Sequence, residues 1–231
     1  NIIIRTEKIR EIGEALKTKN ILYISAFYGS GKTVLLDQTA AAAVEEWGKS
    51  VIRFNAASDK WEAFAEKLTR KDYDKENTLF MFDSLHAADS DTLGKLSEFL
   101  RKLPEKAQAI LCGRAKIPEK MNGMVLRGDM RILDVDFVMF TKSEITELFG
   151  TYEISLRNED VLYLKTKAWG WVQMLHAVAE KLGDSPAVPI SSMRLGIGER
   201  FGETFLKDIV YRLPDDEITL LFGLSVLDSF D

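Results

Sequence analysis

The strongest constraint on the fold of this chain lies in residues 21–33, where an apolar run leads directly into a glycine-containing loop. Residues 21–25 suit a buried strand, and the loop that follows holds two glycines and closes on Gly-Lys-Thr. Residues 34–44 are rich in Ala and Leu and contain neither Gly nor Pro, which predicts a helix. A strand, a glycine loop ending in Gly-Lys-Thr and a helix form the context in which this loop, the Walker A motif, binds phosphate.

The residue types in the loop match what a bound phosphate needs. Glycines let backbone N–H groups turn inward, and together with the helix N-terminus these groups attract an anion. Lys32 would contact the β- and γ-phosphates, and the Thr33 hydroxyl would ligate Mg²⁺. The motif normally has glycine where this chain has Ala26, and the alternative is an ordinary strand–turn–helix with a surface lysine. We favour a nucleotide site formed by Tyr28, Gly29, Ser30, Gly31, Lys32, Thr33 and Val34.

A carboxylate further along the chain fits the same site. Residues 79–83 are typical of a buried parallel strand, and the strand ends at Asp83. At the end of such a strand, a Walker B aspartate holds Mg²⁺ directly or through water. The alternative is an acidic residue that merely starts a loop. With the glycine loop in place, we interpret Thr33 and Asp83 as the Mg²⁺ ligands.

The residues that follow Asp83 bear on hydrolysis. Many hydrolytic P-loop enzymes carry a second acid there, which orients or deprotonates the attacking water. This chain has Ser84, whose hydroxyl is a poor base, and His86 either reaches the γ-phosphate region or caps a turn. We therefore expect tight binding with slow or assisted hydrolysis. No catalytic residue is assigned firmly, and the candidates are Lys32, Asp83, His86 and Arg114.

Three further residues have both a functional and a structural interpretation. Arg114 follows an apolar strand, where a guanidinium can sense a γ-phosphate or simply lie in solvent. Gly170, between two tryptophans, either lets the backbone approach the nucleotide or serves packing. His176 lies beside Leu175 in a helical pattern, and we expect a packing or surface role for it.

Strand and helix patterns alternate over roughly the first 140 residues, which predicts a parallel sheet with helices on both faces. From residue 141 the pattern is helical only, and it begins with a capping box at 141–144. Later helices are expected over 205–213 and from 218. The expected strands are 21–25, 51–54, 79–83, 107–112 and 131–135.

Composition narrows the class of protein. A chain with 46% hydrophobic and 29% charged residues is typical of soluble globular proteins. No apolar run approaches the roughly 18 residues that span a bilayer, so no membrane partner is expected. The lone Cys112 lies in an apolar run and fits a reducing, cytoplasmic setting. A net charge of −5 argues against a nucleic-acid-binding module.

In this order and spacing, the motifs resemble the nucleotide-binding module of STAND-class ATPases, in particular MalT-like transcriptional regulators of the LuxR family. Residues 25–35 are similar to that family's Ala-Pro-Ala-Gly-Tyr-Gly-Lys-Thr loop, in which the first glycine is also usually replaced. Further similar stretches are 82–86 (the Walker B segment, Asp-x-x-His included), 112–114 (a Ser-Arg sensor), 140–144 (the Phe-Thr-x-x-Glu start of a lid), 166–175 (Thr-x-Gly-Trp-Pro) and 205–227 (the opening of a winged helix).

Three residues depart from the family's pattern. Phe27 replaces a proline of the loop, and Ser84 stands where an acid is frequent. Val172 replaces the proline that helps to position the nucleotide from the lid. The departure at Ser84 puts hydrolysis in doubt.

The resemblance implies an α/β, AAA-like P-loop NTPase core at 1–140, a helical lid at 141–198 and the start of a winged-helix domain at 199–231. It also implies a switch that holds ADP as a closed monomer and self-associates in the ATP state, with Arg114 and Gly170 as nucleotide sensors. The chain opens without Met, and we expect it to be a piece of a longer protein. The inducer and promoter DNA would then be bound by domains absent from this chain.

Two other functions stay open. An AAA-type ATPase motor, or another turnover P-loop NTPase, would need a hydrolytic acid and an arginine supplied by a second copy, and Ser84 argues against it. A nucleotide-free interaction domain would retain the fold alone. Intact Lys32, Thr33 and Asp83 argue against that interpretation.

Overall fold

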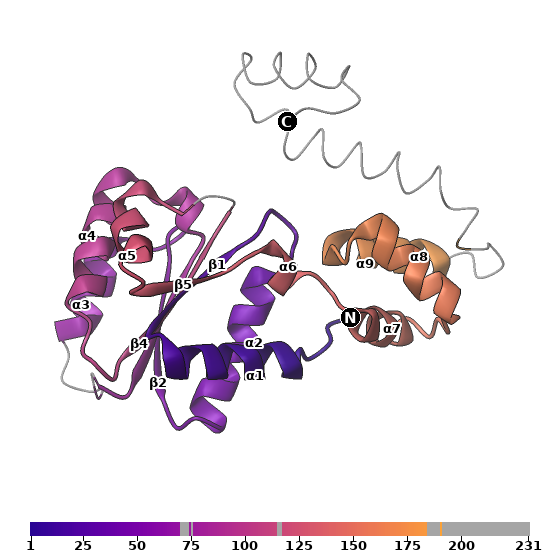
Figure 1. Ribbon diagram of the computed structural model, residues 1–231, viewed down its shortest axis with the longest axis horizontal. Coiled ribbons are helices and arrows are strands. Elements are labelled where there is room, and N and C mark those ends of the chain that lie inside the picture. Colours follow the sequence, from indigo (N-terminus) through magenta and orange to yellow (C-terminus); the bar gives the residue numbers. More distant parts are fainter. Residues whose placement is uncertain (70–73, 75, 115–116, 184–189, 191–231) are drawn as a thin grey trace, which may run out of the picture.

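The computed structural model describes residues 1–69, 74, 76–114, 117–183 and 190 (Figure 1). Within them, one sheet of five parallel strands has the order β2-β3-β4-β1-β5. This confirms the predicted α/β fold with a parallel sheet. The strands are β1 (Ile21–Ser25), β2 (Ser50–Asn55), β3 (Thr78–Asp83), β4 (Gln108–Gly113) and β5 (Met130–Leu133).

Helices cover both faces of the sheet, as the alternating pattern predicts (Figure 1). Side chains of β3 show how one strand serves both faces. Leu79 and Met81 point to the first face, and Phe80 and Phe82 point to the second, because successive side chains in a strand alternate. The first face packs against α1 (Thr6–Thr18), α2 (Lys32–Glu45) and α6 (Val135–Val138), and the second against α3 (Trp61–Thr69), α4 (Ser90–Arg101) and α5 (Asn122–Leu126).

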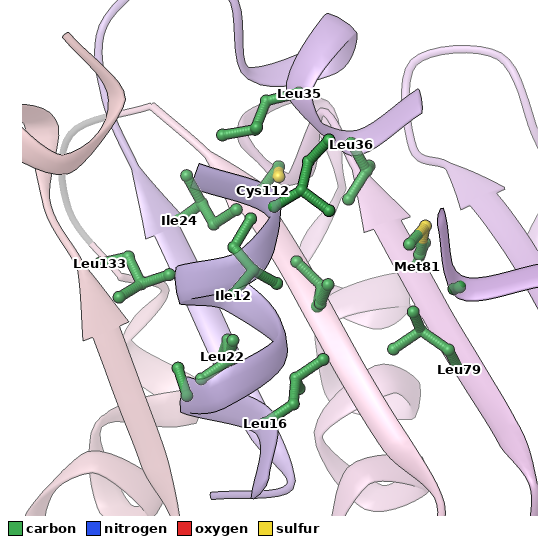
Figure 2. Close-up of a cluster of buried hydrophobic side chains, with 14 of the residues drawn as sticks. Ile12, Leu16, Leu22, Ile24, Leu35, Leu36, Leu79, Met81, Cys112 and Leu133 are labelled. Carbon is green, nitrogen blue, oxygen red and sulfur yellow. The ribbon is translucent and has the colours of Figure 1, made fainter. Parts of the chain in front are cut away.

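The core on the first face is aliphatic. Figure 2 shows Ile12 and Leu16 of α1 and Leu35 and Leu36 of α2 packed over the sheet residues between them. The second face is aromatic instead, and α3 and α4 contribute rings that pack edge to face with ring centroids 5.0 to 5.9 Å apart. Both faces are covered by buried, packed side chains, so the sheet is a rigid base for the loops at its edge.

The carboxyl ends of parallel strands meet at one edge of a sheet, and here this edge gathers the predicted functional residues. Ser25, the last residue of β1, pairs with Gly113 of β4, and Asn55 of β2 pairs with Asp83 of β3. Ligands of open α/β sheets bind beyond this edge. The phosphate loop, residues 26–31, leaves β1 there.

Three helices form a separate cluster, which we call the lid: α7 (Lys142–Gly150), α8 (Asn158–Ala168) and α9 (Val172–Gly183). Figure 1 shows them beside the sheet layer, next to the N-terminal segment. The predicted capping box is confirmed, since the Thr141 side chain accepts from the Glu144 N–H and the Glu144 carboxylate accepts from the Thr141 N–H.

Arg5, in the segment before α1, bonds to the lid and to the chain that connects the core to the lid. Its buried guanidinium donates to Glu144 at 2.7 Å and to the Val138 carbonyl at 2.8 Å, and it lies 4.7 Å from the centre of the Phe140 ring. Burial alone would raise the pKa of Glu144, but hydrogen bonds from Arg5 and the Thr141 N–H outweigh it and lower that pKa. This ion pair joins the segment before α1, the core-to-lid connection and the lid.

The fifth strand is shorter than predicted. β5 ends at Leu133, and Asp134 accepts a hydrogen bond from the Phe137 N–H as the N-cap of α6. A short α6 therefore replaces the end of the expected 131–135 strand. The helices predicted over 205–213 and from 218, and with them the winged-helix opening at 199–231, lie outside the described residues. No helix in the described ranges is long and apolar enough to cross a membrane.

We expect Leu36→Ala to lower the free energy of unfolding by about 2–5 kcal/mol, because Leu36 is fully buried between α2 and the sheet. Val44→Ala is the matched control in the same helix. Val44 is 56% exposed, so its truncation should change stability by less than about 0.5 kcal/mol. Urea unfolding followed by circular dichroism measures both, and equal losses would contradict the packing described here.

Candidate nucleotide-binding site

A cavity of about 590 Å³ lies between the carboxyl edge of the sheet and the lid. This volume is within the range of small-ligand pockets in proteins. The cavity collects residues from the phosphate loop, the ends of β3 and β4, the segment before α1 and two helices of the lid. The predicted site residues that line it are Tyr28, Gly29, Ser30, Gly31, Lys32, Thr33, Val34, Asp83, His86 and Arg114.

The phosphate loop needs both of its glycines. Gly29 and Gly31 have φ angles of 68° and 86°, a left-handed conformation that glycine adopts without a steric penalty. A β-carbon at Gly29 would overlap the Gln173 side chain, and one at Gly31 would come within 3.2 Å of Val172. The lid therefore approaches the loop backbone closely, and α2 begins directly after it.

Lys32 folds over the loop, where its ammonium group lies among three oxygens. It donates to the Ala26 carbonyl at 2.7 Å, the Phe27 carbonyl at 2.8 Å and the Ser30 hydroxyl at 3.1 Å. Burial lowers the pKa of Lys32 to about 8, while the three acceptors favour the charged form at neutral pH. This places a buried cation on the floor of the cavity.

Thr33 and Asp83, the predicted Mg²⁺ ligands, are brought together. The Thr33 hydroxyl donates to Asp83 Oδ2 at 2.9 Å, and Asp83 Oδ1 accepts from the Ser84 N–H at 2.6 Å. A hydroxyl beside a carboxylate is a set of hard oxygen donors, which is the chemistry that suits Mg²⁺. Elsewhere in the described residues, no group of three or more His, Cys, Asp or Glu side chains has the arrangement of a metal site.

His86 lies on the cavity wall, and the backbone turns at Ser84 shortly before it. Ser84 has a φ of 57°, a left-handed conformation, and the short helix Leu85–Ala87 follows. Burial first, and then the positive charges of Arg114 and Lys32, lower the pKa of His86, so its imidazole is neutral at pH 7. A neutral imidazole can accept a proton, and His86 lines the cavity just after the end of β3.

Arg114 stacks on a loop residue. Its guanidinium lies 5.1 Å from the centre of the Tyr28 ring, and both side chains line the cavity. A guanidinium over an aromatic face is held by attraction to the ring's negative centre. Tyr28 is thus the aromatic neighbour of Arg114, a contact that the sequence analysis did not anticipate.

Gly170 has a different place from the one expected of a nucleotide contact. It does not line the cavity, and its carbonyl accepts from the Phe140 N–H at 2.8 Å. Its φ is 81°, and a β-carbon there would overlap the Phe140 backbone. The glycine is needed because two backbone segments of the lid meet closely at this point.

The lid contributes cavity residues that the sequence analysis missed. Gln173 donates its backbone N–H to the Gly29 carbonyl at 3.2 Å, so the start of α9 contacts the phosphate loop. Phe27 packs against Trp169 and Trp171 at the same junction, with ring centroids 6.3 and 5.4 Å apart. His176, expected to be a packing or surface residue, lines the cavity as well. Other missed residues are Ile2, Ile3, Arg5, Ala57, Cys112, Phe140 and Leu148, and Val172, which stands where the resembled family has a proline, lines the cavity too.

No protein-family model and no curated protein matches this chain. Solved structures do match, among them three that each have a TM-score of 0.55. They include the replication initiator DnaA bound to AMPPCP and single-stranded DNA (18% identity, 91% of this chain, 70% of that one) and the RuvB Holliday junction branch migration motor of Thermotoga maritima (15%, 94%, 80%). A Walker-type ATPase of Pyrococcus abyssi also matches (10%, 92%, 77%).

These likenesses establish the fold. The chain has the α/β fold of P-loop ATPases of the AAA+ type, with its parallel sheet and C-terminal helices. Identities of 18% and below show nothing narrower. The resemblance to MalT-like regulators stays a prediction.

We expect Tyr28→Ala to weaken discrimination between ADP and a non-hydrolysable ATP analogue by about 2- to 5-fold, because Arg114 loses its aromatic support. Tyr28→Phe keeps the ring and should behave as the wild type. Calorimetric titration of both nucleotides measures the ratio of dissociation constants. If the Ala and Phe variants discriminate equally, Tyr28 does not position Arg114.

Proposed function

We propose that this chain binds ADP and ATP with Mg²⁺ in the cavity between sheet and lid, and acts as a nucleotide-dependent switch. One observation carries the proposal: the phosphate loop, the Thr33–Asp83 pair and the lid all line a single cavity. A nucleotide in it would contact the core and the lid together. Its binding would then bias how these two parts are arranged.

The phosphates belong at the loop. Backbone N–H groups at the start of α2 and the ammonium of Lys32 supply positive charge there. Thr33 and Asp83 would hold Mg²⁺, which neutralises phosphate charge when it is bound. Lys32 would exchange its contacts with the Ala26 and Phe27 carbonyls for phosphate oxygens.

The base belongs at the opposite end of the cavity. There the wall is apolar and comes from the segment before α1 and from the lid, with Ile3, Phe140 and Leu148. A planar base buries its faces against such side chains without needing charge. The two ends of the cavity thus match the two ends of a nucleotide.

Hydrolysis is expected to be slow or assisted. Ser84 cannot act as a base, and His86 is the titratable side chain next along the chain that lines the cavity. Arg114 would respond to a γ-phosphate from its place on Tyr28. These residues suit a protein that distinguishes bound ADP from bound ATP, rather than a protein that hydrolyses ATP rapidly.

The proposed switch would be one part of a larger protein. In this proposal the ATP form self-associates, and further domains bind an inducer and promoter DNA, as in the MalT-like regulators that the motifs resemble. The net charge of −5 agrees with DNA binding elsewhere than on this chain. The setting would be cytoplasmic, as the single buried Cys112 suggests.

A turnover AAA-type ATPase is the second candidate, and the comparisons favour it. The solved structures that match include the RuvB motor and DnaA with AMPPCP. A motor of this class would hydrolyse ATP rapidly and only as an oligomer, since a second copy would supply an arginine. Turnover therefore separates the two proposals.

We expect purified protein to release stoichiometric ADP on denaturation, identified by chromatography, and to hydrolyse ATP far more slowly than about one per second. Asp83→Asn should release less nucleotide, because it weakens the Mg²⁺ site. Brisk hydrolysis that rises with protein concentration would favour the motor. Absence of nucleotide, both after purification and in titration, would leave only an interaction domain.

A further inference from the structure

Helix α9 presents residues to the cavity at one-turn spacing, and the last of them is His176. The first ones, Val172 and Gln173, meet the phosphate loop, since the Gln173 N–H donates to the Gly29 carbonyl. His176 lies four residues beyond Val172, about one helical turn and about 6 Å farther along the axis. His176 is therefore on the lid side of the cavity, away from the phosphate loop.

The cavity residues on the lid wall are apolar or already bonded, and outside them the N-terminal amine of Asn1 and the Glu180 carboxylate act on His176 by their charges. Phe140 and Leu148 line the same lid wall, and both belong to the buried cluster of the lid. Arg5 lies there too, but its guanidinium is bonded to Glu144 and to two backbone carbonyls. His176 thus offers a polar group to this part of the cavity that Arg5 does not.

The His176 ring is held in place by Tyr152. Its Nδ1 lies 2.8 Å from the hydroxyl of Tyr152, and the two rings meet edge to face at 5.9 Å. Tyr152 follows α7 and does not line the cavity. Burial lowers the pKa of His176, so the ring is neutral at pH 7, with one donor and one acceptor nitrogen. With Nδ1 engaged by Tyr152, Nε2 is the nitrogen left for a ligand.

We propose that His176 is a specificity residue that recognises adenine: Nδ1–H donates to the Tyr152 hydroxyl, and Nε2 accepts a hydrogen bond from the exocyclic amino group of the base. Guanine presents an oxygen at the corresponding position, so two acceptors would face each other. Tyr152 is the positioning residue that holds the ring direction, and the proposed form of the ring carries its proton on Nδ1. This inference rests on the proposed nucleotide site and adds the residue that selects the base.

A polar group is needed to distinguish one base from another. Apolar walls hold the faces of any base equally well, whereas a single polar atom in an apolar wall rejects a base that leaves it unpaired. The sequence holds two histidines, His86 and His176, and both line the cavity. His86 follows Asp83 at the phosphate end. Each end of the proposed nucleotide would therefore lie near one histidine, whose NMR signals can report on binding there.

The first experiment records the imidazole nitrogen signals of ¹⁵N-histidine-labelled protein by NMR, with His176→Phe for assignment. Inorganic pyrophosphate with Mg²⁺ should shift the His86 signals alone, and ADP with Mg²⁺ should shift those of both histidines. The unliganded His176 should show Nδ1 protonated. If ADP shifts His86 but leaves His176 unchanged, the inference is wrong. If ADP shifts neither and does not bind by calorimetry, the proposed function itself fails.

The second experiment compares the dissociation constants of ADP and GDP by calorimetry. His176→Phe keeps an aromatic ring but removes the acceptor, and should reduce the preference for ADP by about 3- to 10-fold. Tyr152→Phe should reduce it by about 2- to 3-fold, since it frees the ring without removing it. Lys167→Ala, at an exposed lid position outside the cavity, is the control and should change nothing. An unchanged preference in His176→Phe would overturn the inference.

Discussion

The whole site depends on the contact between the phosphate loop and the start of α9. A backbone hydrogen bond joins Gln173 to Gly29, and the absence of a β-carbon at Gly29 and Gly31 is what lets the lid come so near. Any ligand that draws the loop amides toward itself must change this contact. The loop is thus both the proposed binding element and the part of the core that contacts the lid, and the proposed switch depends on this contact.

The second fixed point is the buried ion pair of Arg5 and Glu144. An isolated buried charge is costly, but here the guanidinium is paired, bonded to the Val138 carbonyl and placed over the Phe140 ring. Removing either partner would leave the other charge unpaired where the core passes into the lid. The pair therefore sets the position of the lid wall that forms the proposed base end of the cavity.

Local patterns in the sequence predicted the sheet and the loop that lines one end of the cavity, because each depends on neighbouring residues. The strand before the loop, Asp83 at the end of β3 and the capping box at Thr141 are of this kind. The lid end was not predictable in the same way. Arg5 meets Glu144 across 139 positions, and His176 reaches the cavity only because α9 packs against the loop. Gly170 looked like a nucleotide contact, since a glycine between tryptophans does not reveal which backbone it approaches.

The most direct measurement is calorimetric titration of ADP with Mg²⁺ into nucleotide-free protein and into Lys32→Ala. The account predicts one site per chain in the wild type and about 10- to 100-fold weaker binding in the variant, because a buried cation that contacts phosphate is lost. Thermal unfolding of both proteins checks that the variant folds. Equal affinity in the two proteins, or no binding in either, would contradict the claim that this cavity holds a nucleotide by its phosphates.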